Sequence, residues 1–480
     1  MRFGKSIISL AVLFACNDSK RPVLPVTMSD GTIDLGESFV IDEGNKMILY
    51  NGNHSKLSKK IKVGDKTYEI ENTATQFDLG KAYRVSLNGE NYLLYKSKLP
   101  IVSINVGNGK VVDDPKIPAR MRLLETGKLP LDHIIGIELR GGASQGYPKK
   151  SYSVELWDDP DGEEKIDDSL LGMRLDDDWV LDGLYNEPLR LRDFVSHGIW
   201  SKIARYPHSE LEDISIGIQR QYCELFLNGD YRGIYYLGEK VDRQQLSLTK
   251  FDGSLRGELY EGHAWSQAVM FRKASEFDNS LMFWDGFEAK YPDDIGEFDW
   301  SNLSSLVDFI GNSTTAEFDE KIAGMFDVRN AADYYIFVNL IFALDNLGKN
   351  LYTARYDVDN PYFFVGWDFD GSFGNFFTGR RMPTSSNILK NNLFARLAEN
   401  KCFVDEVKSR WNFLREDELS TLKLQEKFRE AFEYLKNNGA YEREALNPSL
   451  QFNYSDEEID FIKSFIEQRT ILLDAYFSEL

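Results

Sequence analysis

The sequence has few cysteines and few histidines, and this scarcity excludes several kinds of site. Three of the 480 residues are cysteines, Cys16, Cys223 and Cys402, too few for a disulfide framework. The last two lie in apolar contexts and are predicted to be buried free thiols. The five histidines show no metal-ligand spacing, and no Gly-x-Ser-x-Gly motif or Cys/His hydrolase pattern occurs. A histidine-based zinc site and a serine or cysteine hydrolase site are therefore not indicated.

Long apolar runs and an excess of basic residues are also lacking. No segment of about 20 apolar residues occurs, so no membrane-spanning helix is expected. The formal net charge is −21, which argues against nucleic acid as a partner, although a local basic cleft could still bind a nucleotide. Apolar residues make up 42% of the chain, enough for a large packed core. The length suggests roughly three domains, or a two-lobed enzyme with one small accessory domain.

The first 20 residues differ from the rest. Arg2 and Lys5 precede a short apolar run at 7–15, a pattern typical of a secretory signal. Leu13-Phe14-Ala15-Cys16 resembles a bacterial lipobox, in which the cysteine is lipid-modified, and a polar tether follows. The alternative is an ordinary buried start of a domain. We expect residues 1–20 to be a lipoprotein signal peptide and tether. The protein would then be extracytoplasmic, on the periplasmic or surface face of a bacterial cell envelope, and would contact the membrane only through a lipid on Cys16.

Strand signals dominate up to about residue 250. Residues 21–98 predict a small all-β domain, a spacer or adhesion module, from short strand candidates at 39–41, 47–50, 66–70 and 83–87 that Gly and Asn separate. Residues 99–250 predict a β-rich lobe with a helix at 189–204 and a hairpin whose tip is Asn228-Gly229.

The remaining part, residues 251–480, is predicted to be mainly helical. An apolar stretch at 330–343 predicts a buried helix. The final helix is predicted to begin with a capping box, in which Ser455 is the N-cap and Glu458 follows three residues later.

A glycine-containing basic loop is the first candidate site. It runs from Arg140 to Ser144, and its glycines would let backbone N–H groups approach a phosphate closely. Strand alternation predicts that Lys150 lies on the apolar, inward face with Tyr152, whereas Lys149 lies on the opposite face. An inward lysine needs an anionic partner, a phosphate or a carboxylate. The alternative is a lysine that reaches the rim of the lobe or pairs with a structural acid.

Two further acids could belong to the same site. Glu239 ends the predicted hairpin and could meet a cation, a lysine or a ribose, although a solvated turn acid is the more common outcome. Asp193 lies on the predicted helix at 189–204, which could supply a partner for Lys150. A surface ion pair is the alternative for Asp193.

The segment from Asp345 to Asp370 carries the strongest chemical signal. Asp345 follows the predicted buried helix, Asn350 comes five residues later, and a strand-like apolar run ends at Asp368, with Asp370 two residues on. Protein kinases need this order of groups, an acid for the hydroxyl proton and then Asn and Asp for the metal ions that hold ATP. Carboxylate and amide oxygens suit Mg²⁺, and acids beside bulky apolar groups are costly unless they are neutralised. The alternative is a pair of turn-forming aspartates before Gly371.

Taken in order, these segments resemble the spore coat protein H (CotH) family of atypical kinases over about residues 100–480. The matching segments are Arg140-Gly141-Gly142-Ala143-Ser144, Pro148-Lys149-Lys150-Ser151-Tyr152, Asp178-Trp179-Val180-Leu181, Leu191-Arg192-Asp193, Leu227-Asn228-Gly229-Asp230, Glu239-Lys240-Val241-Asp242, Asp345 with Asn350-Leu351-Tyr352, and Trp367-Asp368-Phe369-Asp370.

The resemblance implies an α+β, two-lobed atypical protein-kinase-like fold with a β-rich N-lobe and a helical C-lobe, here preceded by the small all-β domain. It also implies transfer of the ATP γ-phosphate to Ser or Thr of a protein, with Mg²⁺ or Mn²⁺. By position, the resemblance implies that Lys150 contacts the α/β phosphates, beside the loop that holds Arg140 and Ser144, and that Glu239 lies beside the nucleotide. It also implies that Asp345 orients or deprotonates the acceptor hydroxyl. Asp368, with Asn350 and Asp370, would hold the metal ion.

Two departures from the family pattern leave a second function open. His197-Gly198 stand where relatives often have Tyr-Glu, and Asn346 to Lys349 stand where relatives often place a histidine before the asparagine. ATP is also scarce outside the cytoplasm. The alternative is a catalytically weak or inactive kinase-fold surface lipoprotein that acts as a binding or scaffold module. The expected partners are a nucleotide and a substrate or envelope protein, and no nucleic acid.

Overall fold

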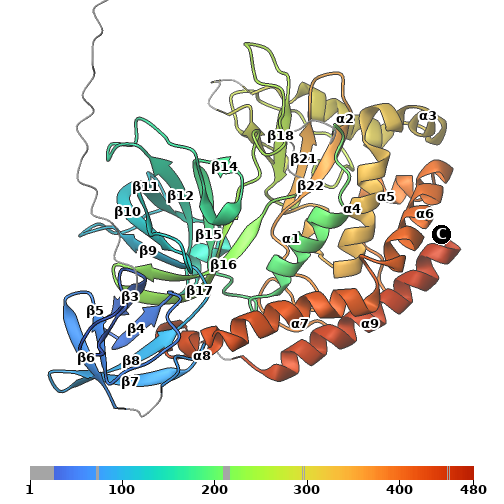
Figure 1. Ribbon diagram of the computed structural model, residues 1–480. Helices are drawn as coiled ribbons and strands as arrows, with labels where there is room; N and C mark the ends of the chain where they lie inside the picture. Colours follow the sequence, from blue (N-terminus) through green and yellow to red (C-terminus); the bar gives the residue numbers. More distant parts are fainter. Residues whose placement is uncertain are drawn as a thin grey trace, which may run out of the picture.

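The structure is a computed structural model that describes residues 26–71, 75–208, 217–293, 296, 298–450, 452 and 454–480. It is a mixed α+β fold in which an N-terminal sheet, a closed barrel and a further sheet with helices follow one another along the chain (Figure 1). The predicted signal peptide and its Cys16 lie outside the described residues. Within the described part of the chain, every helix is too short or too polar to cross a membrane.

The N-terminal sheet has the strand order β1-β2-β5-β6-β7-β8-β4-β3. Its core contains alternating inward side chains such as Tyr50, Tyr68 and Tyr92. The strands predicted at 39–41, 47–50, 66–70 and 83–87 are confirmed as β3, β4, β6 and β7. The strand bounds are β1 (Val26–Thr27), β2 (Ile33–Asp34), β3 (Phe39–Asp42), β4 (Met47–Tyr50), β5 (Lys60–Val63), β6 (Lys66–Ile70), β7 (Ala82–Leu87) and β8 (Glu90–Lys96).

Direct contacts fix this sheet to the rest of the protein. The Asp42 carboxylate accepts a hydrogen bond from the backbone N–H of Tyr231, with a separation of 2.9 Å. Gly80 and Gly439 touch through their backbones, because a Cβ on Gly439 would lie 2.6 Å from the carbonyl oxygen of Gly80. Both glycines have positive φ, 72° and 67°, so the contact requires residues without a side chain.

The barrel closes in the order β10-β11-β12-β15-β17-β16-β9. Its interior is apolar and includes Val154, Leu181 and Leu225. The predicted hairpin is confirmed, since Asn228 and Gly229 form the turn of β16–β17 with φ of 53° and 85°. The strand bounds are β9 (Ile101–Asn105), β10 (Ile117–Leu124), β11 (Leu131–Arg140), β12 (Ser151–Trp157), β15 (Asp178–Asp182), β16 (Arg220–Leu227) and β17 (Asp230–Glu239). Smaller elements are η1 (Ala143–Gly146), β13 (Asp168–Ser169), η2 (Leu170–Gly172) and β14 (Leu175–Asp176).

A second sheet, of order β19-β20-β18-β21-β22, lies beside the helices (Figure 1). Its strands are β18 (Glu258–Gly262), β19 (Phe283–Trp284), β20 (Phe287–Tyr291), β21 (Leu351–Arg355) and β22 (Tyr362–Gly366). The helices are α1 (Arg192–Ile203), α2 (Ser301–Asn312), α3 (Thr315–Met325), α4 (Val328–Ile341), η3 (Asp345–Leu347), α5 (Asn392–Leu397), α6 (Lys401–Glu416), α7 (Thr421–Asn437), α8 (Ala440–Ala445), η4 (Pro448–Leu450) and α9 (Asp456–Glu479).

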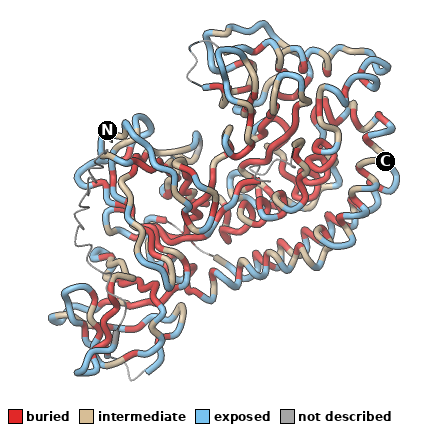
Figure 2. The backbone as a smooth tube through the Cα atoms, turned by 45° about the horizontal axis from the view of Figure 1, so that its top comes forward, coloured by how far each residue is buried: buried red, intermediate tan, exposed pale blue. Residues whose placement is uncertain are grey.

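Helix α4 forms the centre of this part and confirms the buried helix predicted at 330–343. Twelve of its 14 residues are buried, and Figure 2 shows this interior in red with exposed residues on the outer helices. Asp327 caps its start by accepting a hydrogen bond from the Asn330 N–H, 2.7 Å away. Phe342 ends it in the left-handed region, with φ of 56°, so that the chain turns sharply before Asp345.

Two details of the sequence prediction are wrong. Ser455 caps α9, but Glu458 does not complete a capping box, because its buried carboxylate pairs with Arg192 at 2.5 Å and with Arg381 at 2.6 Å. A charge pair holds the carboxylate more strongly than a backbone N–H does. Cys223 is buried as predicted, whereas Cys402 is exposed in the first turn of α6.

Candidate active site

The hairpin β21–β22 brings two predicted site residues together. Leu351 pairs with Gly366 at the open end of the hairpin, so the residue before β21 and the residues after β22 lie side by side. The side-chain amide of Asn350 donates a hydrogen bond to Asp368 Oδ2 over 2.9 Å. Both residues have positive φ, 55° and 52°, a conformation that Asn and Asp adopt more readily than most residues. The sheet therefore creates the Asn350–Asp368 pair from segments 18 residues apart.

Asn346 fixes the loop that follows α4. Its buried side-chain amide donates to the carbonyl oxygens of Asn350 at 2.9 Å and Trp367 at 2.7 Å. Its own carbonyl oxygen accepts from the Tyr334 hydroxyl of α4, 2.9 Å away. One asparagine thus holds both ends of the hairpin against the central helix.

Asp345 begins η3 and is half-buried at the edge of this loop. Burial raises the pKa of its carboxyl, and the nearby Lys349 ammonium opposes that rise. The Asp345 carbonyl oxygen accepts from the Lys349 backbone N–H at 2.7 Å, which keeps the loop closed. A carboxylate with a raised pKa is a better proton acceptor than an ordinary one.

Four carboxylates interact electrostatically around Asp368. The pKa of Asp368 is raised to about 6, first by burial and then by the charge of Asp182, while two arginines oppose the shift. Burial and the charge of Asp368 raise the pKa of Asp370 well above its usual range, and Asp345 acts in the same direction on both. Asp182 ends β15 of the barrel, where its Oδ1 accepts from the Leu184 N–H at 2.8 Å. Such a group of like charges favours a bound cation.

Two guanidinium groups lie over the ring of Trp367, beside these acids. Arg140, at the end of β11, is 4.8 Å from the ring centroid, and Arg220, at the start of β16, is 5.1 Å from it. Arg220 is buried and forms an ion pair with Asp193 of α1. The other oxygen of Asp193 accepts from the Phe369 N–H at 2.7 Å. The positive charges and α1 together hold the 367–370 segment in place.

The prediction that Lys150 lies on the inward face is wrong. Lys150 is only half-buried and donates to the Gln145 carbonyl oxygen, 2.5 Å away, within its own loop. Ser144 likewise donates to the Arg140 carbonyl oxygen at 3.1 Å. The buried lysine is Lys149, because β12 begins only at Ser151 and strand alternation does not extend to the residues before it.

Lys149 belongs to a buried ion network between the barrel and helix α8. Its ammonium lies 2.6 Å from Glu444 of α8 and also donates to the Ile234 carbonyl oxygen. Arg190 pairs with the same Glu444 oxygen at 3.1 Å. Burial lowers the pKa of Lys149 to about 7, although Glu444 opposes that shift. This network joins β17, α8 and the start of α1.

Glu239 is buried at the end of β17 and binds the backbone. Its two oxygens accept from the Gln219 N–H at 2.7 Å and the Arg174 N–H at 3.1 Å. Burial raises the pKa of its carboxyl. In this structure Glu239 fixes two chain segments beside the barrel, and its place beside a nucleotide stays a prediction.

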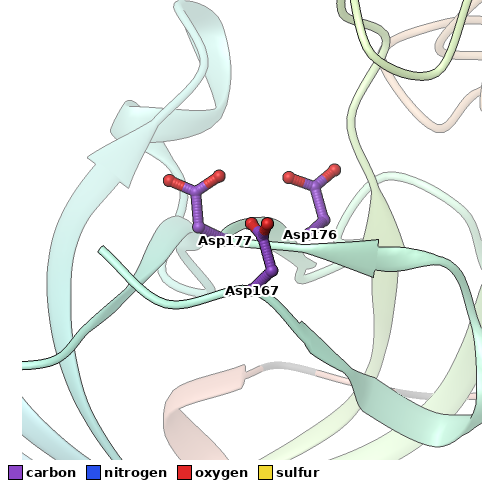
Figure 3. A group of neighbouring side chains, drawn as sticks. All are labelled: Asp167, Asp176 and Asp177. Atoms are coloured by element: carbon purple, nitrogen blue, oxygen red, sulfur yellow. The ribbon is translucent and has the colours of Figure 1, made fainter.

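A second group of acids lies near β14, and none of its members is a predicted site residue. Oxygens of Asp167, Asp176 and Asp177 lie within 4.8 Å of one another, and Figure 3 shows the three carboxylates pointing to the same side. Burial raises the pKa of Asp176 to about 7. Arg174 is already paired with Asp176, so the deepest of these acids has a protein partner.

A buried histidine of α1 packs against the 367–370 segment. His197 is 2% exposed, and neither ring nitrogen has a hydrogen-bond partner among the described residues. Its ring lies 4.7 Å from that of Phe369. Burial lowers the pKa of His197 to about 3. Asp193 Oδ1 is 3.5 Å from His197 Nε2, but that carboxylate is already paired with Arg220 and so does little to favour a charged ring.

We expect His197 to make the protein sensitive to acid. The unfolded histidine takes up a proton below about pH 6.5 while the folded one stays neutral, so stability is lost as pH falls, by up to about 1.4 kcal/mol per pH unit. Urea unfolding at about pH 7.5 and about pH 5 measures this loss. It should shrink in His197→Leu and persist in His263→Gln, whose side chain is 57% exposed. An equal loss in wild type and His197→Leu would contradict the expectation.

The structure brings together Arg140, Asp345, Asn350, Asp368 and Asp370 of the predicted site. The side-chain hydrogen bonds of Lys150 and Glu239 are made outside this group, and Ser144 contacts it only at the Arg140 backbone carbonyl. The sequence prediction missed three residues that shape the site, Asp182, Arg220 and Asn346. Asp182 had a usable signal, since it is the first acid after the buried run Trp179-Val180-Leu181.

Comparison with known proteins gives a family match. A family model described as "CotH kinase protein" matches residues 137–473. No curated protein matches the chain. Among solved structures, the crystal structure of a Helicobacter pylori proinflammatory kinase CtkA is 10% identical, with 66% of this chain and 89% of that chain covered. The TM-score of 0.22 is too low for this likeness to bear on the fold.

Proposed function

Because the chain belongs to the CotH kinase protein family, we propose that it transfers the γ-phosphate of ATP to a Ser or Thr hydroxyl of a protein. The observation that carries this proposal is the Asn350–Asp368 pair, 2.9 Å apart, with Asp345 and Asp370 in electrostatic contact. Acids and an asparagine grouped in this way match what phosphoryl transfer needs.

We assign the barrel as the N-lobe and the second sheet with its helices as the C-lobe, with the nucleotide between them. Arg140 and Asp182 come from the barrel, whereas Asp368 follows β22 of the second sheet. The charges of both barrel residues act on the Asp368 carboxyl, which supports a site formed by the two parts.

Asp368, Asp370 and Asn350 would hold Mg²⁺ or Mn²⁺. Their hard oxygen donors suit either cation, and a bound cation would offset the mutual repulsion of the carboxylates. A bound cation would neutralise phosphate charge during transfer. Arg140 would bind a phosphate oxygen from the barrel side, with the loop to Ser144 and Lys150 beside it. Asp345 would accept or orient the acceptor hydroxyl.

Replacing Asp345 by Asn should lower phosphate transfer about 100-fold or more, because an amide cannot accept the hydroxyl proton. The measurement is incorporation from labelled ATP with Mg²⁺ or Mn²⁺ into the protein itself and into a general acceptor such as casein. Binding of a fluorescent ATP analogue should stay close to the wild-type value. The matched control is Asp308→Asn, at an exposed position of α2. Equal incorporation in wild type and Asp345→Asn would contradict a role for Asp345 in the reaction. Absence of incorporation by every form, the wild type included, would contradict the proposed kinase activity.

A second function is favoured by the position of Lys150. This lysine binds its own loop rather than the acids, so the chain could bind nucleotide weakly or act as an inactive binding module. Nucleotide binding without phosphate transfer would support the function as an inactive binding module. In either case we propose an extracytoplasmic protein, anchored at the cell envelope by a lipid on Cys16, with an envelope or substrate protein as partner. The lipobox-like sequence supports this location.

A further inference from the structure

A strip of exposed aromatic side chains leads away from the candidate active site. It begins at Trp265, whose ring lies against Gly348, because a Cβ on Gly348 would be 3.0 Å from two of its atoms. His263 follows, held by a hydrogen bond from its backbone N–H to the Gly286 carbonyl oxygen at 2.8 Å. The ring of His263 lies 5.4 Å from that of Phe283 in β19. Trp265 and Phe283 are each 49% exposed.

The strip ends in a surface groove of about 610 Å³. Phe277, Leu281 and Phe283 line it and are 40%, 55% and 49% exposed. Adjoining apolar side chains that stay this exposed mark a binding surface. The charged residues of the lining are all acids, Glu276, Asp278 and Asp285.

We propose that the strip and the groove bind the segment of the acceptor protein that flanks the phosphorylated hydroxyl, a segment with basic and apolar side chains. This inference rests on the proposed function, since it takes the acceptor to be a protein. The strip starts at Gly348, three residues from Asp345, so a chain lying on it passes beside the group assigned to the acceptor hydroxyl.

Charge complementarity decides between possible occupants. Three carboxylates at the groove attract a cationic segment and repel an anionic one. A second copy of this chain carries a formal net charge of −21 and is disfavoured, as is an anionic lipid surface. The apolar side chains of the segment would cover Phe277 and Phe283, and its basic side chains would pair with the acids at the rim.

Fluorescence anisotropy of a labelled synthetic peptide tests the proposal. The probe has alternating Arg and Leu residues around one Ser, and two control peptides replace every Arg by Glu or every Leu by Gly. The full chain is used without nucleotide or metal, so binding is scored independently of phosphate transfer. We expect the Arg/Leu peptide to bind at least about tenfold more tightly than either control. Phe283→Ala and the double variant Asp278→Asn/Asp285→Asn should each weaken it about tenfold or more, whereas Phe413→Ala, 64% exposed on α6, should not.

Equal binding of the three peptides, or of wild type and Phe283→Ala, would overturn the proposal. So would self-association in sedimentation velocity that Phe283→Ala abolishes while the peptide does not bind, since the occupant would then be a second copy. Peptide binding by a chain that transfers no phosphate would leave the groove assignment standing and remove only the kinase activity. Phosphate transfer to the peptide with the same KM in wild type and Phe283→Ala would support the kinase activity and contradict the groove assignment.

Discussion

Asp368→Asn should abolish phosphate transfer and, without divalent cations, should make the folded protein more stable at neutral pH. The first effect follows from the loss of the carboxylate proposed to hold the metal, and we expect transfer to fall about a thousandfold or more. The second follows from the raised pKa of Asp368, about 6, because ionising this carboxyl in the fold costs free energy. An asparagine keeps the oxygen that accepts from Asn350 and removes the charge.

The sign of the stability effect depends on pH. A carboxyl whose folded pKa lies above its unfolded value stabilises the fold when protonated, and that stability is lost as pH rises from about 4 through about 6. Asp368→Asn should therefore match the wild type near pH 4 and exceed it by about 1–3 kcal/mol near pH 7.5. Urea unfolding in EDTA measures this difference, with Asp460→Asn, 78% exposed on α9, as the control. Loss of activity together with loss of stability would indicate a folding defect and contradict the assignment.

Glu444→Gln should destabilise the protein by about 3–5 kcal/mol, although it lies outside the candidate active site. The change leaves the Lys149 ammonium and the Arg190 guanidinium buried without their shared counter-charge. The backbone N–H of Ile234, which donates to the other Glu444 oxygen at 3.2 Å, can still bond to the glutamine. The expected loss therefore comes from the unpaired charges.

The lowered pKa of Lys149 allows this explanation to be tested through the pH dependence of stability. Its folded pKa of about 7 lies below its unfolded value, so charging it in the fold is costly, and this cost disappears as pH rises towards about 10. Unfolding in urea should show a larger defect of Glu444→Gln near pH 7 than near pH 9.5. The double variant with Lys149→Met should recover part of the loss, and Glu442→Gln, an exposed neighbour, should be close to wild type. A defect below about 1 kcal/mol would show that the network contributes little.

Much of the local structure could be predicted because its causes are local. Asn228-Gly229 supplies the positive φ that a tight hairpin needs, and the apolar stretch at 330–343 specifies a buried helix without reference to distant residues. The order Asp345, Asn350, Asp368 was also visible, since it reflects the sequence of elements along one hairpin. These features require no knowledge of what lies across the fold.

The parts that could not be predicted depend on contacts distant in sequence. The sequence predicts that Glu458 completes a helix cap, but Arg192, 266 residues earlier, pairs with its carboxylate. Lys149 is buried because Glu444 comes from α8 to meet it, and no alternation rule contains that information. Asp182 and Arg220 join the candidate site only once the barrel closes beside the second sheet.

The geometry of β21–β22 sets different limits on length at its two ends. Asn350 and Asp368 meet because the strands between them pair in register, so one residue added within β21 would turn Asn350, and one added within β22 would turn Asp368, to the opposite face. The tip has no such constraint: Val358 and Asp359 are exposed there, and a longer loop costs only a little closure entropy. A reporter or affinity tag inserted between Val358 and Asp359 would therefore leave the other end of the hairpin undisturbed, provided that the two strands keep their length.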